Sequence, residues 1–289
     1  MASTDTRNAE SNSNSKRLWQ MITVGVFSAL IGLAGCGGGK SDPNKVVVGT
    51  MSGQETTLME TARDVAKERY GLTLEIVQYT DYTKPNSDLE SKKIDANVFQ
   101  HLPYLELAMK AHGYDFTVVG KTFVYPMGLY SEKHTHVADF PEGATIAIPA
   151  DPSNLARALL LLQDHNLIGL DSERFTVTLE NIKSNPKHWA FKEVTQEELV
   201  KLMPELDGAI INTNYAVNMD LHPSTDALVH EAATSPYANL VVVRTEYAKE
   251  EKFTKLVAAL HSPEVVAKAQ ELFKDGAIPA WSTTSRKAP

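Results

Sequence analysis

From Lys45 onward, short apolar segments alternate with longer segments that show helical periodicity. The first apolar segment, KVVVGT, is followed by a predicted helix from about Gln54 to Tyr70, which Gly71 ends. The next apolar segment, LTLEIVQY, alternates apolar and polar positions as a strand does. Strands and helices in regular alternation form layered α/β proteins with mainly parallel sheets. We therefore expect the α/β class, with each sheet flanked by helices.

The same alternation continues to about Lys274 and falls into two successive sets of elements. This organisation predicts two lobes, one formed by residues 45–125 plus 238–289 and the other by residues 126–237. Extended, proline-containing crossings near Tyr125–Tyr130 and Thr234–Tyr237 would join the lobes as hinges. Further extended segments are predicted over 94–99, 116–131, 144–150, 175–182, 208–211 and 237–245, and further helices over 86–93, 103–112, 153–167, 195–203 and 249–274.

Residues 1–36 differ in kind from the rest of the chain. Lys16 and Arg17 precede an apolar run, MITVGVFSALIGLAG, that ends at Cys36, the only cysteine. A positive flank, a short apolar core and small residues before a cleavage point form a secretory signal, and the run is short for a membrane span. LAGC at 33–36 resembles the bacterial lipoprotein signal, in which the cysteine is acylated. We predict a lipoprotein signal peptide over 1–36, a lipid on Cys36 and a flexible tether over 37–44; the alternatives are a free thiol or cleavage at another small residue.

Composition and motifs argue against several function classes. The net charge of −8 and the lack of a basic patch disfavour nucleic acid as a partner. The sequence contains no GxSxG, no recognisable Ser/Lys pair and no Gly-rich phosphate loop, so neither covalent catalysis nor nucleotide binding is expected. His134 and His136 form the only close histidine pair, without a clear third metal ligand. We therefore expect no enzyme activity, no cofactor and no metal.

Polar side chains occupy the predicted ligand side of the sheets, beyond the carboxyl ends of strands. Arg157 lies about one turn into an otherwise apolar helical segment, where free N–H groups and the helix dipole also favour an anion. Its guanidinium can hold a carboxylate through two parallel hydrogen bonds. Asn212 ends the apolar segment GAII and Asn239 begins another, so either amide can bind a carboxylate or an ammonium. The alternatives are an arginine that reaches solvent and amides that satisfy turns.

Aromatic and imidazole side chains form a second candidate group. Phe99, His101 and Tyr104 lie at the chain reversal in IDANVFQHLPYL, and Tyr82 lies in another loop that follows a strand. These side chains could fill an ordinary core, and a lone histidine is more often structural than functional. Their shared position on the ligand side of the sheets favours the wall of a pocket instead.

These segments together resemble a known family, the methionine-binding lipoproteins of bacterial ABC importers. The resemblance extends over nearly all of the chain after Cys36. It is carried by segments in the family's order: DYTKPN, IDANVFQHLPYL, IAIPADPSNLARALLLL, AIINTNYA, SPYANLVVVR and DGAIPAW.

The resemblance implies a two-lobe periplasmic-binding-protein fold that holds a free amino acid in the cleft. Arg157 and Asn212 would bind the ligand carboxylate, Asn239 would fix the polar end of the ligand, and the ring side chains described above would enclose the thioether of methionine. It also implies a monomer that is lipid-anchored to the cell membrane, faces the periplasm or the cell exterior, and delivers methionine to an ABC permease and its ATPase. D-methionine or a short methionine-containing dipeptide is an alternative ligand, and a metal-binding lipoprotein of an ABC importer is an alternative function.

Overall fold

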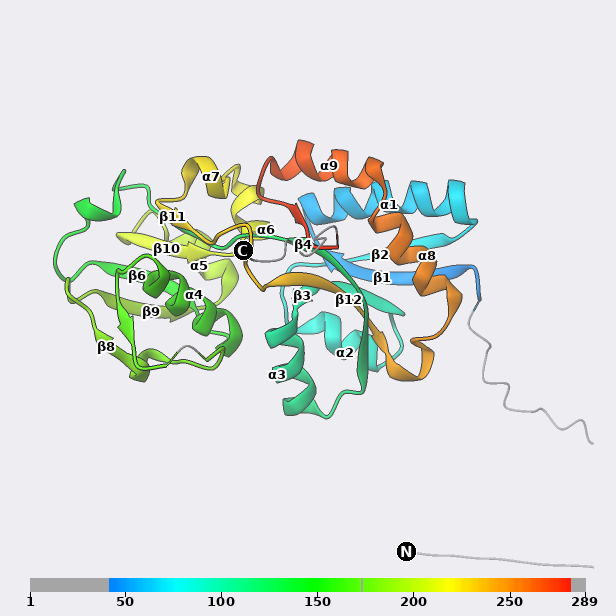
Figure 1. The fold of residues 1–289 in the computed structure, drawn as a ribbon, viewed down its shortest axis with the longest axis horizontal. Coiled ribbons are helices and arrows are strands. Elements are labelled where there is room, and N and C mark those ends of the chain that lie inside the picture. The colour runs from blue at the N-terminus through cyan, green and yellow to red at the C-terminus, as the bar shows by residue number, and fades with distance from the viewer. Residues whose placement is uncertain (1–41, 173, 282–289) are drawn as a thin grey trace, which may run out of the picture. The chain divides into compact units, whose positions relative to one another are not determined.

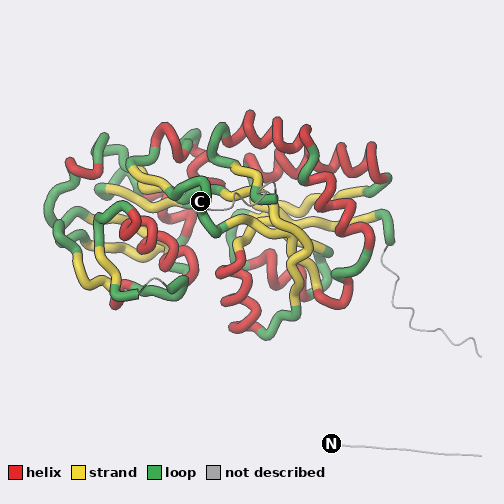
Figure 2. The backbone as a smooth tube through the Cα atoms, viewed as in Figure 1, coloured by secondary structure: helices red, strands yellow, loops and turns green. Residues whose placement is uncertain are grey.

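The computed structural model of the protein describes residues 42–172 and 174–281. The predictions for the signal peptide at 1–36, for a lipid on Cys36 and for most of the tether at 37–44 lie outside these ranges. Within them, no helix is both long enough and apolar enough to cross a membrane. The strands gather into two main sheets with helices around them, as Figure 2 shows by colour. The predicted α/β class is confirmed.

The larger sheet contains the strands β1 (Lys45–Met51), β2 (Thr73–Tyr79), β3 (Ala96–His101), β4 (Phe116–Val124), β12 (Ala238–Arg244) and β13 (Ile278–Pro279). Their spatial order is β13-β4-β12-β3-β1-β2. β1 pairs in parallel with β2 and β3, so that Lys45 faces Thr73. β12 inserts antiparallel between β3 and β4, although it comes late in the chain. A late segment of the chain therefore completes the sheet that the first strands begin.

Helices cover both faces of the larger sheet (Figure 1). α1 (Gln54–Tyr70), α8 (Glu251–Leu260) and α9 (Pro263–Phe273) pack on one face, and α2 (Lys84–Glu90) and α3 (Leu102–His112) pack on the other. In β12, Val241 and Val243 pack with the first group of helices, whereas Leu240 and Val242 pack with the second. A strand that is buried on both faces is apolar at successive positions, which explains the run LVVV.

Local sequence signals set the ends of these helices. Gly71 follows α1 in the left-handed conformation, with φ at 62°, and its N–H bonds to the carbonyl oxygen of Lys67. The hydroxyl of Ser262 accepts a hydrogen bond from the backbone N–H of Val265 at the start of α9. The predicted helix from Gln54 to Tyr70 is confirmed at both ends.

The smaller sheet contains β5 (Gly128–Tyr130), β6 (Thr145–Pro149), β9 (Ala190–Val194), β10 (Gly208–Ile211) and β11 (Val229–His230). Their order is β11-β5-β10-β6-β9. α4 (Pro152–Asp164) packs into one apolar cluster with Ile146 and Ile210, whereas α5 (Gln196–Leu202) and α6 (Thr213–Ala216) share another with Ala147 and Ile211. Helices thus cover both faces of this sheet as well (Figure 1).

Shorter elements complete the fold. They are the ribbon of β7 (Gly169–Leu170) and β8 (Ile182–Ser184), the helix α7 (Pro223–Asp226) and the 3₁₀ turns η1 (Val137–Asp139), η2 (Leu179–Asn181), η3 (Val217–Met219) and η4 (Thr245–Tyr247). The chain passes between the two main sheets through residues 125–127, which join β4 to β5, and through residues 231–237, which join β11 to β12.

Two expectations need correction. Both sheets are mixed, because β5, β11, β12 and β13 pair antiparallel with their neighbours. Residues 175–182 are not extended throughout, because Thr178 and Asn181 close a 3₁₀ turn in which the Asn181 side chain accepts from the Thr178 N–H at 2.8 Å. Such local side-chain bonds compete with strand pairing, while the apolar Val177 packs into the core beside α4.

Candidate functional site

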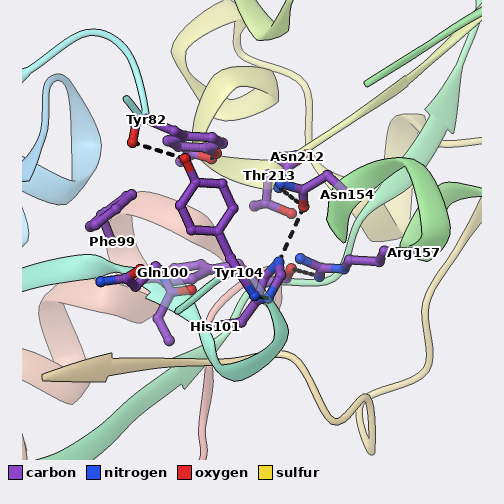
Figure 3. Close-up of a pocket in the computed structure, with 12 residues that line it drawn as sticks. Tyr82, Phe99, Gln100, His101, Tyr104, Asn154, Arg157, Asn212 and Thr213 are labelled. Atoms are coloured by element: carbon purple, nitrogen blue, oxygen red, sulfur yellow. Dashed lines mark hydrogen bonds between the residues drawn. The ribbon is translucent and has the colours of Figure 1, made fainter. Parts of the chain in front are cut away.

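A pocket lies between the two main sheets and holds about 360 Å³ of unoccupied space, part of it open to solvent. Figure 3 shows that side chains from distant segments of the chain converge on it. Every side chain predicted to contact a ligand lines this pocket. The lining residues are Tyr82, Phe99, Gln100, His101, Tyr104, Tyr125, Asn154, Arg157, Asn212, Thr213, Asn214 and Asn239.

The larger sheet supplies one side of the pocket. Phe99 and His101 come from the carboxyl end of β3, and Tyr104 from the first turn of α3. Tyr82 comes from the loop after β2, and Asn239 from the start of β12. Since β12 runs antiparallel to β3, its start lies at the edge where β3 ends. This edge is the ligand side of a sheet of this kind.

The smaller sheet supplies the other side of the pocket. Asn212 directly follows β10. Asn154 and Arg157 lie near the start of α4, which begins after the N-cap Asp151, whose carboxylate accepts from the backbone N–H of Asn154 at 3.0 Å. The cap and Pro152 at the first helical position fix where α4 starts, and thereby which of its side chains face the pocket.

Aromatic rings form one wall of the pocket. The ring of Tyr82 lies 5.8 Å from Phe99, 6.0 Å from Tyr104 and 5.5 Å from Tyr215, measured between centroids. Tyr82 donates a hydrogen bond to Oδ1 of Asn214 at 2.7 Å, and Tyr104 donates one to the carbonyl oxygen of Tyr82 at 2.9 Å. The hydroxyls therefore have partners and the ring faces provide an apolar surface. Tyr215, from the segment AIINTNYA, packs against Tyr82 and does not itself line the pocket.

His101 is neutral and hydrogen-bonded on both ring nitrogens. Burial, together with the positive charge of Arg157, lowers its pKa to about 3. Its Nδ1 accepts from the N–H of Tyr104 at 3.3 Å, so the proton is on Nε2, which lies 3.2 Å from Oδ1 of Asn154. The same Oδ1 accepts from Nδ2 of Asn212 at 3.0 Å, as the dashed lines in Figure 3 show. Oδ1 of Asn212 is buried and has no partner within the described part of the chain.

Arg157 is only 3% exposed, and its guanidinium is held on most sides. Its Nε donates to Oε1 of Glu231 at 2.8 Å and its Nη2 to Oε2 of the same carboxylate. Nη2 also donates to the carbonyl oxygen of Tyr125 at 2.8 Å, and the ring of Tyr237 lies over the guanidinium at 4.4 Å. Burial disfavours the charge, but Glu231 outweighs it and raises the pKa of Arg157.

This arrangement corrects two expectations about Arg157. The partner of its charge is Glu231, 74 residues away in sequence, and not solvent at a helix end. The grip through two parallel hydrogen bonds is already made with that carboxylate, so it is not available to a ligand. Nη1 has no hydrogen-bond partner among the described residues and is the donor left for the pocket. No local pattern in the sequence identified Glu231.

A second buried carboxyl group lies behind Asn239. Nδ2 of Asn239 lies 3.4 Å from Oε1 of Glu55, which belongs to the first turn of α1. Burial raises the pKa of Glu55 to about 8, against the opposing effect of the Asn239 hydrogen bond. At neutral pH this group is therefore mainly uncharged.

Buried amides support the wall that carries Phe99 and His101. Asn86, Asn97 and Gln100 are linked by hydrogen bonds of 2.7 to 2.9 Å. They tie α2 to β3 below the rings, and Gln100 itself lines the pocket. Sequence reasoning missed them, although amides inside the apolar strand ANVFQH were a visible signal.

His134 and His136 have different surroundings in the structure. His134 pairs with Asp207 at 3.1 Å, and His136 lies exposed at the start of η1. Within residues 42–172 and 174–281, no group of three or more His, Cys, Asp or Glu side chains is placed to hold a metal ion.

Comparisons with known proteins agree with this architecture. The D-methionine-binding lipoprotein MetQ of Escherichia coli K12 is 40% identical over 261 residues, which cover 89% of this chain and 96% of that protein. A periplasmic substrate-binding protein of an ABC transporter from Coxiella burnetii is 49% identical, with a TM-score of 0.80 over 81% of this chain and all of that one. A nutrient-binding protein from Burkholderia cenocepacia, solved with bound methionine, is 39% identical with a TM-score of 0.80 over 82% and 100% of the two chains. The family model of the NlpA lipoproteins matches residues 46–281. The chain therefore belongs to the NlpA lipoprotein family.

Proposed function

We propose that this protein is an extracytoplasmic, lipid-anchored substrate-binding protein that captures methionine and delivers it to an ABC importer. One observation carries the proposal: the pocket between the sheets joins an apolar aromatic wall to a cluster of amides and one guanidinium. That combination suits a ligand with an apolar side chain and an amino-acid head group. The methionine bound to the Burkholderia cenocepacia relative supports it.

In this proposal Arg157 and Asn212 bind the ligand carboxylate, and the amide of Asn239 binds the ammonium. Asn212 would donate to the carboxylate through the second N–H of Nδ2, since the first is bonded to Asn154. Its unpartnered Oδ1 is an acceptor and suits a donor such as the ligand ammonium, because a buried acceptor without a donor is costly. Tyr82, Phe99, Tyr104 and neutral His101 enclose the thioether. Burial of a methionine side chain contributes roughly 1.5–3 kcal/mol, and contact of sulfur with aromatic edges adds about 0.3–1.5 kcal/mol.

The ligand would also hold two lobes together. We take residues 45–125 with 238–289 as one lobe and 126–237 as the other, with hinges at the crossings between the sheets. Hydrogen bonds already join the two sides, among them Tyr82 to Asn214 and Nδ2 of Asn218 to the carbonyl oxygen of Ser52 at 3.3 Å. A ligand that contacts both lobes favours the closed arrangement.

The remaining parts of the proposal concern the membrane and the partners. A lipid on Cys36 would hold the protein at the membrane, outside the cytoplasm, beside the permease whose ATPase acts within the cell. The protein itself would be a monomer and catalyse no reaction. Labelled palmitate supplied to growing cells should enter the wild-type protein and not a Cys36→Ala variant; equal labelling of both would refute the anchor.

The binding test uses full-length protein in detergent. Mass spectrometry of the protein as purified from rich medium should identify methionine, and would equally reveal a methionine-containing dipeptide. After release of that ligand, calorimetry with L-methionine, D-methionine and leucine should give the tightest binding for a methionine isomer. Binding of leucine as tight as that of methionine, or no binding of either isomer, would overturn the proposed ligand. Metal analysis of the same sample tests the metal-binding alternative.

A further inference from the structure

Glu231 contacts Arg157 from outside the pocket. Among the described residues that line the pocket, Arg157 is the one with a full charge, since His101 is neutral. Glu231 does not line the pocket. It lines a second cavity together with Arg157, Asp164, Phe175 and other residues. Arg157 therefore borders the ligand space, while its Nε and Nη2 contact a carboxylate that lies outside that space.

The position of Glu231 is fixed by more than its bonds to Arg157. It is 9% exposed, and its Oε2 also accepts from the backbone N–H of Met127 at 2.9 Å. Its own N–H donates to the carbonyl oxygen of Met127 at 3.0 Å. Residues 125–127 and 231–237 are the crossings between the sheets, so the carboxylate joins both crossings to Arg157. Such a buried pair stays in place when a ligand binds, because separating the charges away from water is costly.

Building on the proposed function, we propose that Glu231 determines the charge specificity of the site. Its carboxylate compensates the charge of Arg157, so the pocket presents a hydrogen-bond donor to a carboxylate without a net positive field. A zwitterionic amino acid then satisfies the site. A purely anionic analogue would bind less well, because Glu231 already neutralises the positive charge of Arg157 that such a ligand needs. Binding sites often gain specificity from features that make the binding of competing ligands unfavourable.

Other carboxyl groups near the pocket do not replace Glu231. Glu55 is mainly uncharged at neutral pH. Asp151 caps α4 and accepts from Nδ2 of Asn154 at 3.0 Å. Its charge is the same in wild-type protein and in any Glu231 variant, so it cancels in a comparison between them.

The test measures affinity for three probes that share one side chain. Methionine has no net charge, 4-(methylthio)butanoate carries only the carboxylate, and 3-(methylthio)propylamine carries only the ammonium. Calorimetry on full-length protein in detergent compares wild type with Glu231→Gln, which keeps an acceptor for the Met127 N–H. We expect the variant to favour the anionic over the cationic probe by on the order of tenfold or more relative to wild type, because a unit charge acts strongly at this range in a buried site. A ratio unchanged in the folded variant would overturn the proposal.

Two controls separate charge specificity from stability. Asp164→Asn removes a negative charge from the outer cavity without touching Arg157 and should leave the probe ratio unchanged. Glu231→Asp keeps the charge and should keep the wild-type preference, even if all affinities fall. If Glu231→Gln does not fold, the wild-type protein alone decides, because an anionic probe bound more than a hundredfold tighter than the cationic one would refute compensation. Absence of methionine binding to wild type would instead refute the proposed function.

Discussion

Replacing Arg157 with alanine should damage stability and binding through separate physical effects. The substitution removes the partner of Glu231, whose side chain is only 8% exposed in the pair. A buried carboxylate left without its partner costs roughly 3–5 kcal/mol. For a chain of this size, at about 2–4 °C for each kcal/mol, the loss corresponds to a melting temperature lower by roughly 6–20 °C.

The same substitution should reduce methionine affinity by about 10- to 150-fold, because the ligand carboxylate loses the donor at Nη1. A hydrogen bond to a charged group contributes about 1.5–3 kcal/mol. Calorimetry well below the melting temperature measures this effect on folded protein. Far-ultraviolet circular dichroism during heating measures the stability of the same sample.

A double variant separates the two effects. Arg157→Met with Glu231→Gln removes both charges together, fills the space and keeps an acceptor for the Met127 N–H. Replacing a buried ion pair with neutral side chains of similar volume is often neutral or stabilising. We therefore expect the melting temperature to recover most of its loss while methionine binding stays weak.

Two results would refute this reasoning. If Arg157→Ala melts at the wild-type temperature, then the loss of the ion pair with Glu231 does not lower the free energy of unfolding. Near-wild-type affinity in the double variant would remove Arg157 from the binding site altogether.

Three further perturbations test other parts of the structure. The pKa of His101 falls to about 3 on folding, so the unfolded chain binds a proton on this imidazole more readily than the folded chain does. The free energy of unfolding should therefore decline by at most about 1.4 kcal/mol per pH unit as the pH falls from 6.5 toward 3. Denaturant unfolding at several pH values should show a smaller decline in His101→Asn. The pKa of Glu55 rises to about 8 on folding, so its contribution is full below pH 4.5 and is lost as the pH rises toward 8; Glu55→Gln should gain a few kcal/mol over wild type at pH 8 and little at pH 4.5, and an equal gain at both values would refute the burial argument. Gly53 has φ at 88°, and a Cβ there would lie 2.1 Å from Oδ1 of Asn218; Gly53→Ala should cost roughly 1–3 kcal/mol and weaken methionine binding, whereas Gly143→Ala, at φ 73° with open space around it, should cost stability without affecting affinity.

Much of the fold follows from signals that act over a few residues. The helix from Gln54 to Tyr70 was predictable because Gly71 ends it through a local left-handed turn. The position of Arg157 in the first turns of a helix followed from the apolar pattern around it. The placement of β12 could not be predicted in this way, because a run such as LVVV fits parallel and antiparallel neighbours equally well. Its antiparallel insertion between β3 and β4 depends on partners more than a hundred residues away.

The same division holds for the pocket. The sequence by itself determined the α/β class and which loops follow the strands, because periodicity, caps and turns depend on neighbours within one or two helical turns. Only the tertiary structure decided that Glu231 binds Nε and Nη2 of Arg157, and that Asn239 lies against Glu55, whose pKa burial raises. Compensation of a buried charge depends on which segments meet in space and on how completely they exclude water, and neither quantity is encoded in a local pattern.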